Sequence, residues 1–98
     1  MRKRREKILW VDDEIQHLKP HILFLEEKGY KLFQANNGQD AISLSKSNVF
    51  DLVLLDQSMP GMDGLTTLAE LKKIRKSQII IMITKTEDEW LMDEAINN

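Results

Sequence analysis

The sequence has no cysteine, few aromatic residues (6%), two prolines and four glycines. Without cysteine it can form neither a disulfide nor a thiolate metal site, and a reducing cytoplasm is the location we expect. No apolar run approaches the roughly 18 residues that a membrane span needs, so we expect no membrane contact. Linkers, repeats and low-complexity tracts are also absent. These absences predict a single domain for the 98 residues.

The small net charge of −2 hides an uneven distribution of charge. Residues 2–7 carry five basic side chains and one acidic side chain. This segment lacks the apolar region of a signal peptide, and it lacks the aromatic and glycine residues of a nucleic-acid-binding arm. We therefore predict a solvated basic leader over residues 1–6, a folded domain over residues 7–98, and no direct contact with nucleic acid.

Two apolar runs end abruptly in carboxylates. Residues 8–11 are followed by Asp12 and Asp13, and residues 52–55 are followed by Asp56. Unbroken apolar runs of this length are typical of strands that are buried on both faces. Because parallel strands end at the same sheet edge, the three carboxylates should converge there. Like charges this close repel unless a cation lies between them, and oxygen ligands suit a hard divalent ion such as Mg²⁺.

Along the whole chain, the apolar spacing switches regularly between strand and helix, which predicts an α/β fold. The expected strands are residues 7–11, 30–35, 52–56 and 79–84, and the expected helices are residues 15–28, 39–47, 64–76 and 87–96. Pro20 should kink the first helix or delay its start, because it removes one helical hydrogen bond. The third helix should bury one stripe of apolar residues, namely Leu65, Leu68, Leu71 and Ile74.

The turn that follows Asp56 adds a third motif. Residues 57–64 contain proline and glycine, which impose an irregular backbone. Together with Asp12, Asp13 and Asp56, and with Thr84 at the end of the fourth strand, this turn resembles the receiver domain of two-component response regulators, the CheY-like family. The motifs occur in the family's order and each lies at a predicted strand end. The resemblance covers nearly the whole chain.

This resemblance implies a flavodoxin-like, doubly wound parallel sheet. The family has a fifth strand, which carries a Lys-Pro pair, and a fifth helix, and neither has a counterpart here. We therefore expect a receiver that is incomplete at its C-terminus, with strand order 2-1-3-4. The fourth strand would then be an exposed edge without charge, proline or glycine, and association of two copies through this edge is predicted.

The resemblance also implies a role for each residue of the acidic site. Asp56 would accept a phosphoryl group from a sensor histidine kinase, with Mg²⁺ as cofactor. Asp13 would bind the ion directly, Asp12 would bind it through water, and the backbone carbonyl of Ser58 would be a further ligand. Thr84 would be the switch hydroxyl, which draws its loop inward with the fourth helix and signals to a downstream effector. Such a domain is a phosphoacceptor rather than an enzyme.

Other classes of protein compete with this interpretation. A pseudo-receiver would use the same fold as a phosphorylation-independent interaction module, since the family's lysine is missing. A phosphohydrolase with an aspartate nucleophile needs Asp-x-Asp after its first strand, which residues 12–14 do not supply, and neither glycine-rich nucleotide-binding motif occurs. Residues 8–15 and 83–87 also resemble receivers fused to PglZ-type phosphatase effectors.

The residues near the acidic site have simpler alternatives. Glu14 is either a further ligand or, as we favour, an acid in the first turn of a helix. His17 and His21 have a spacing that can bind metal, but we expect both on the surface. Lys85 either brings a positive charge to the site or is solvated, and Met59 and Met62 are expected to line the rim of the site.

Overall fold

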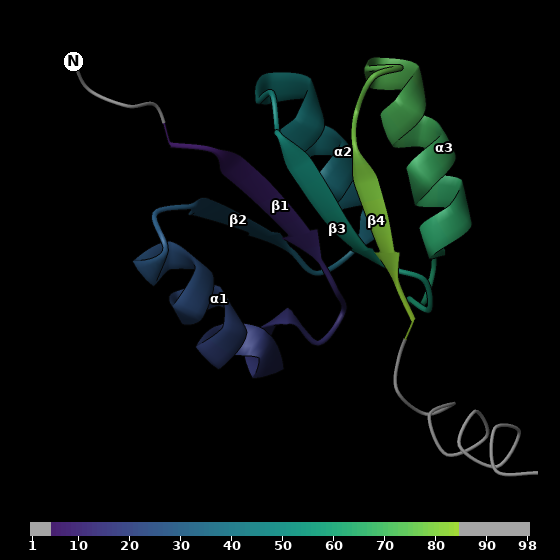
Figure 1. Ribbon diagram of the computed structural model, residues 1–98. Helices are drawn as coiled ribbons and strands as arrows, with labels where there is room; N and C mark the ends of the chain where they lie inside the picture. Colours follow the sequence, from purple (N-terminus) through teal and green to yellow (C-terminus); the bar gives the residue numbers. More distant parts are fainter. Residues whose placement is uncertain (1–4, 85–98) are drawn as a thin grey trace, which may run out of the picture.

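The computed structural model describes residues 5–84, which form a four-stranded sheet with helices on both sides (Figure 1). In chain order the elements are β1 (Lys7–Val11), the 3₁₀ helix η1 (Ile15–Leu18), α1 (Lys19–Glu27), β2 (Lys31–Ala35), α2 (Gly38–Ser47), β3 (Leu52–Asp56), α3 (Gly64–Ile74) and β4 (Ile80–Ile83). All four predicted strands and the first three predicted helices are present. The predicted helix over residues 87–96, Lys85 and most of the basic leader lie outside the described residues.

The sheet is parallel throughout, with strand order β2-β1-β3-β4. This confirms the predicted doubly wound architecture and the order 2-1-3-4. Helix α1 lies on one face of the sheet, and α2 and α3 cover the other face (Figure 1). Alternate residues of β1 and β3 therefore enter two separate cores. The core beneath α2 and α3 holds four strand residues that are fully buried, namely Leu9, Val11, Val53 and Leu55.

Helix α1 starts late, as Pro20 predicts. The preceding residues form the short 3₁₀ helix η1, and Pro20 occupies the first turn of α1, where a missing backbone N–H breaks no helical hydrogen bond. The helix ends before Gly29, whose φ of 102° is a conformation that glycine adopts without steric cost. On the inner face of α1, Ile22 is buried against Trp10 of β1.

Helix α3 corrects one prediction. Leu65, which was expected in the buried stripe, is 62% exposed, whereas Thr67 is fully buried. The buried residues of α3 are Gly64, Thr67 and Leu71, because the helix packs closely on α2 at Gly38. The Thr67 hydroxyl donates to the Asp63 carbonyl at 2.8 Å, so this polar group is satisfied inside the core. The helix also ends two residues earlier than predicted.

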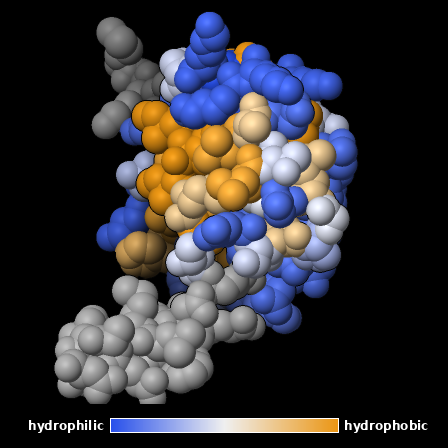
Figure 2. Space-filling view, turned by 90° about the vertical axis from the view of Figure 1, so that its right-hand side faces the viewer, coloured by the Kyte–Doolittle hydropathy of each residue, from blue (hydrophilic) through white to orange (hydrophobic). Residues whose placement is uncertain are grey.

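The two edges of the described sheet differ in character. Strand β2 carries exposed Lys31 and Gln34, whereas β4 and the residue before it expose Ile79 and Ile81 at 61% and 49%. Figure 2 views the molecule from the side of β4 and α3, and hydrophobic atoms gather in one area of that side. Among the described helices, none is long and apolar enough to cross a membrane.

Candidate functional site

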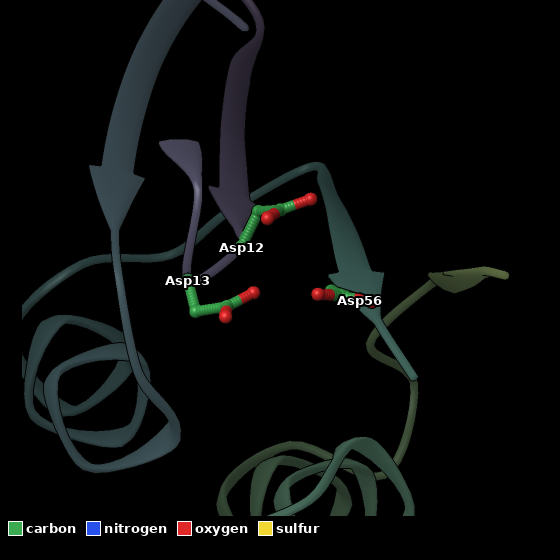
Figure 3. Close-up of side chains that lie close together, drawn as sticks. All are labelled: Asp12, Asp13 and Asp56. Atoms are coloured by element: carbon green, nitrogen blue, oxygen red, sulfur yellow. The ribbon is translucent and has the colours of Figure 1, made fainter. Parts of the chain in front are cut away.

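Asp12, Asp13 and Asp56 converge at the carboxyl edge of the sheet. Asp12 and Asp13 directly follow β1, and Asp56 is the last residue of β3. The two strands are neighbours, with Val11 paired to Leu55. One carboxylate oxygen from each of the three side chains lies within 4.8 Å of the others, and the side chains point into the same space (Figure 3). The structure thus brings together the three carboxylates that the sequence predicts.

Two of the three carboxylates are buried. Asp12 is 4% exposed and Asp56 is fully buried, whereas Asp13 is exposed. Backbone amides orient both buried groups: the N–H of Glu14 donates to Asp12 Oδ1 at 2.8 Å, and the N–H of Ser58 donates to Asp56 Oδ1 at 3.1 Å. Buried carboxylates this close together are costly unless positive charge compensates them.

The donor set fits a hard divalent cation. Every side-chain ligand atom in the cluster is a carboxylate oxygen, which is the ligand type that Mg²⁺ and Ca²⁺ prefer. One carboxylate is open to solvent, so a bound ion could keep several waters, as Mg²⁺ does in phosphoryl-transfer sites. Among residues 5–84, this is the one cluster of three or more acidic, histidine or cysteine side chains with such spacing.

In the loop between β3 and α3, Met59 lies elsewhere than predicted. Met59 is 7% exposed and belongs to the core beneath α2 and α3, so its expected place at the rim of the site is wrong. An apolar side chain in this loop anchors the backbone to the core, which the sequence alone did not reveal. Ser58 is exposed, and the loop reverses at Gly61, which has a φ of 80°.

Asp63 is a residue whose structural role the sequence interpretation missed. Its carboxylate accepts a hydrogen bond from the Thr66 backbone N–H at 2.8 Å and so caps the start of α3. This backbone hydrogen bond, with a smaller contribution from the Thr66 side chain, lowers the pKa of Asp63. An acidic residue three positions before Thr66, at a helix start, was the available signal.

The other candidate residues lie outside the acidic cluster. Thr84 is exposed and follows β4, one residue beyond Ile83, which pairs with Asp56. Glu14 precedes η1 and lies 3.8 Å from His17, between Oε2 and Nδ1. His17 and His21 are both exposed, as expected, and the His21 ring packs edge-on against Trp10 with a centroid distance of 6.4 Å.

The family model, the related sequences and the solved structures that match this chain all belong to one family. The family model of the response regulator receiver domain matches residues 8–98. The transcriptional regulatory protein ResD of Bacillus subtilis is 35% identical over 82 residues, which are 84% of this chain and 34% of ResD. This chain therefore spans only 34% of the length of that curated relative.

Two solved structures show the same fold. The chemotaxis protein CheY4 of Vibrio cholerae is 25% identical with a TM-score of 0.77, over 95% of this chain and 81% of that one. The response regulator TrrA of Thermotoga maritima, solved in complex with Mg²⁺-BeF, is 28% identical with a TM-score of 0.74, over 94% and 97% of the two chains. With its parallel sheet and its acidic cluster, this chain belongs to the response regulator receiver domain family of two-component systems.

Proposed function

We propose that this domain accepts a phosphoryl group on Asp56 from a sensor histidine kinase, with Mg²⁺ held by Asp12, Asp13 and Asp56. The observation that carries the proposal is the approach of the three carboxylates to within 4.8 Å at two adjacent strand ends. In the proposal Asp13 binds the ion directly, Asp12 binds it through water, and the backbone carbonyl of Ser58 completes the protein's ligands.

Phosphoryl transfer requires little of the protein beyond positioning of the reacting groups and neutralisation of their charge. A carboxylate oxygen of Asp56 attacks the phosphorus, and the bond between phosphorus and the donor histidine nitrogen breaks as the new P–O bond forms. The nitrogen keeps the electron pair of the broken bond. Mg²⁺, when bound, supplies positive charge that offsets the carboxylates and the phosphoryl oxygens. The backbone N–H of Ser58 donates to Asp56 Oδ1 at 3.1 Å and so helps to orient the carboxylate.

Thr84, which follows β4, would respond to phosphorylation of Asp56. Thr84 lies at the same sheet edge as Asp56, because Asp56 pairs with Ile83 in the sheet register. In this proposal its hydroxyl donates to a phosphoryl oxygen and biases a two-state equilibrium of the loop that follows β4. The partners are the kinase and a downstream effector protein or domain. Assignment of a PglZ-type effector stays a prediction from the sequence.

A further proposed partner is a second copy of the chain. Within the described residues β4 is an edge strand, because it pairs with β3 on one side and with no strand on the other. The strand carries no charge, proline or glycine, which are the features that commonly protect an edge against pairing. Two copies could therefore pair through β4 and extend the sheet.

Phosphorylation by a small donor tests the acceptor. The purified chain is incubated with acetyl phosphate and Mg²⁺, and its intact mass is measured. One phosphoryl group should be added, and Asp56→Asn should abolish the addition. Asp63→Asn is the matched control, since it makes the same change at a nearby aspartate outside the acidic cluster, where asparagine can still cap the helix. An alkali-labile phosphoryl group on Asp56→Asn would place the acceptor elsewhere.

Binding of beryllofluoride separates this function from that of a pseudo-receiver. A phosphoacceptor should bind one equivalent in the presence of Mg²⁺ and none after removal of the metal by chelation. A chain that binds neither the metal nor beryllofluoride would act instead as a phosphorylation-independent interaction module.

A further inference from the structure

Gly64 lies against the backbone of the proposed acceptor. It is the first residue of α3 and is buried, directly after the capping residue Asp63. Its backbone N–H donates to the carbonyl oxygen of Gln57 at 3.1 Å. This hydrogen bond closes the loop that begins after Asp56, so the start of α3 and the end of β3 are in direct contact.

The contact leaves no room for a side chain at residue 64. A Cβ placed on Gly64 would lie 2.6 Å from the carbonyl oxygen of Asp56 and 2.7 Å from the Cα of Gln57. Both atoms belong to the backbone, so rotation of a side chain could not relieve the overlap. A third neighbour, the Cε of Met82 at 3.0 Å, is the end of a flexible side chain and could move.

The peptide between Asp56 and Gln57 is also held from its other side. The N–H of Gln57 donates to the carbonyl oxygen of Ile83 in β4 at 3.0 Å. The next amide, from Ser58, donates to the carboxylate of Asp56. A displacement of this peptide would therefore disturb both the pairing with β4 and the hydrogen bond that orients Asp56. Since Asp56 is fully buried, its side chain has little space in which to compensate.

We infer that Gly64 is a positioning residue for Asp56: the absence of its side chain lets α3 begin against the Asp56–Gln57 peptide and so directs the Asp56 carboxylate toward Asp12 and Asp13. The inference rests on the proposed function for its consequence in phosphoryl transfer. Its geometric part, the orientation of Asp56 by the Gly64 contact, can be measured without any phosphoryl donor.

The test compares two glycine variants in matched places. Gly38 is likewise the buried first residue of a helix, after the capping residue Asn37. A Cβ on Gly38 would meet side-chain atoms of Thr67 in α3 and of Met62 in the loop before it, and not the backbone of Asp56. Gly38→Ala and Gly64→Ala therefore add the same methyl group at equivalent helical positions. Helix propensity alone would favour both substitutions.

Amide NMR spectra of the 98-residue chain are recorded for both variants without metal, and each is then titrated with Mg²⁺. Gly64→Ala should shift the amide signals of Gln57 and Ser58 and weaken Mg²⁺ binding by about ten-fold or more, because misplacement of a ligand by a fraction of an ångström is sufficient. Gly38→Ala should leave those two signals and the Mg²⁺ affinity close to the values of the unsubstituted chain.

The outcomes separate this inference from the proposed function. Wild-type Mg²⁺ affinity and unshifted Gln57 and Ser58 signals in Gly64→Ala would overturn the inference. Shifted signals in a protein whose unsubstituted form binds no Mg²⁺ would support the inference and contradict the proposed function. If Gly64→Ala is unfolded in buffer, the spectra are recorded in trimethylamine oxide, which favours the compact state. A variant that stays unfolded there would also overturn the inference, because Gly64 would then serve the whole fold.

Discussion

Gln78 and Phe50 are joined by a buried hydrogen bond between the two segments that precede neighbouring strands. The side-chain amide of Gln78, which is 5% exposed, donates to the carbonyl oxygen of Phe50 at 3.1 Å, across 28 residues of sequence. Phe50 precedes β3 and Gln78 precedes β4, so the bond ties together the amino ends of two strands whose carboxyl ends carry Asp56 and Thr84.

Replacement of Gln78 by methionine should destabilise the fold. Methionine has a similar shape but cannot donate, so the Phe50 carbonyl would lose a buried partner at a cost of about 1–3 kcal/mol in the free energy of unfolding. Urea denaturation followed by circular dichroism measures this change. Gln39→Met, at an exposed position of α2, is the control and should be nearly neutral. Equal urea midpoints for the two variants would contradict the prediction.

Two leucines of α3 should respond very differently to truncation. Leu71 is 1% exposed and Leu65 is 62% exposed. Leu71→Ala should lower the free energy of unfolding by about 2–5 kcal/mol, since it removes buried surface and leaves a cavity. Leu65→Ala should change it by no more than about 0.5 kcal/mol. The same denaturation experiment distinguishes them, and a large loss for Leu65→Ala would mean that this side chain is covered in solution.

These leucines also show where prediction from sequence succeeds and where it stops. The strands and the acidic site could be predicted, because a strand buried on both faces has an unbroken apolar sequence and parallel strands end at one edge. The burial of Thr67 in place of Leu65 could not be predicted. It depends on the close approach of Gly38, a contact between two helices that no local spacing encodes.

The same limit applies to single residues in turns. Met59 follows the site in sequence but enters the core, and Gln78 is a polar residue whose burial depends on a distant carbonyl. In both cases the deciding partner is remote in sequence. The late start of α1, by contrast, was predicted, since Pro20 acts through its own missing N–H.

Asp13 should contribute more to Mg²⁺ binding than its neighbour Glu14. Both are exposed acidic residues after β1, but only Asp13 belongs to the cluster with Asp12 and Asp56. Asp13→Asn should weaken Mg²⁺ binding by about ten-fold or more, the scale on which changes to a metal site commonly act. Glu14→Gln should have a small effect. Isothermal titration of the two variants measures both affinities, and an equal loss would indicate a general charge effect instead of coordination.

Capping of α3 by Asp63 should make stability depend on pH in the acidic range. The backbone N–H of Thr66 lowers the pKa of Asp63 below its ordinary value of 3.8. The unfolded chain therefore binds this proton more readily than the folded chain does, and the stabilisation is complete above the ordinary value. It is lost as the pH falls through the lower folded value. The urea midpoints of the unsubstituted chain and Asp63→Asn should therefore approach each other as the pH falls below 3.8. A difference that is constant from about pH 6 to about pH 3 would exclude this role for the carboxylate.

Association through β4 can be tested at one isoleucine and one leucine whose side chains are almost equally exposed. Ile81 in β4 is 49% exposed and Leu23 in α1 is 48% exposed. If two copies pair along β4, sedimentation of the 98-residue chain at micromolar concentration should show a dimer. Ile81→Lys should shift the chain toward the monomer, because a charge on an edge strand opposes pairing with a second edge. Leu23→Lys removes a similar apolar surface from α1 and should leave the dimer intact. Equal loss of association in both variants would indicate general hydrophobic contact, and a monomeric unsubstituted chain would show that β4 does not pair with a second copy.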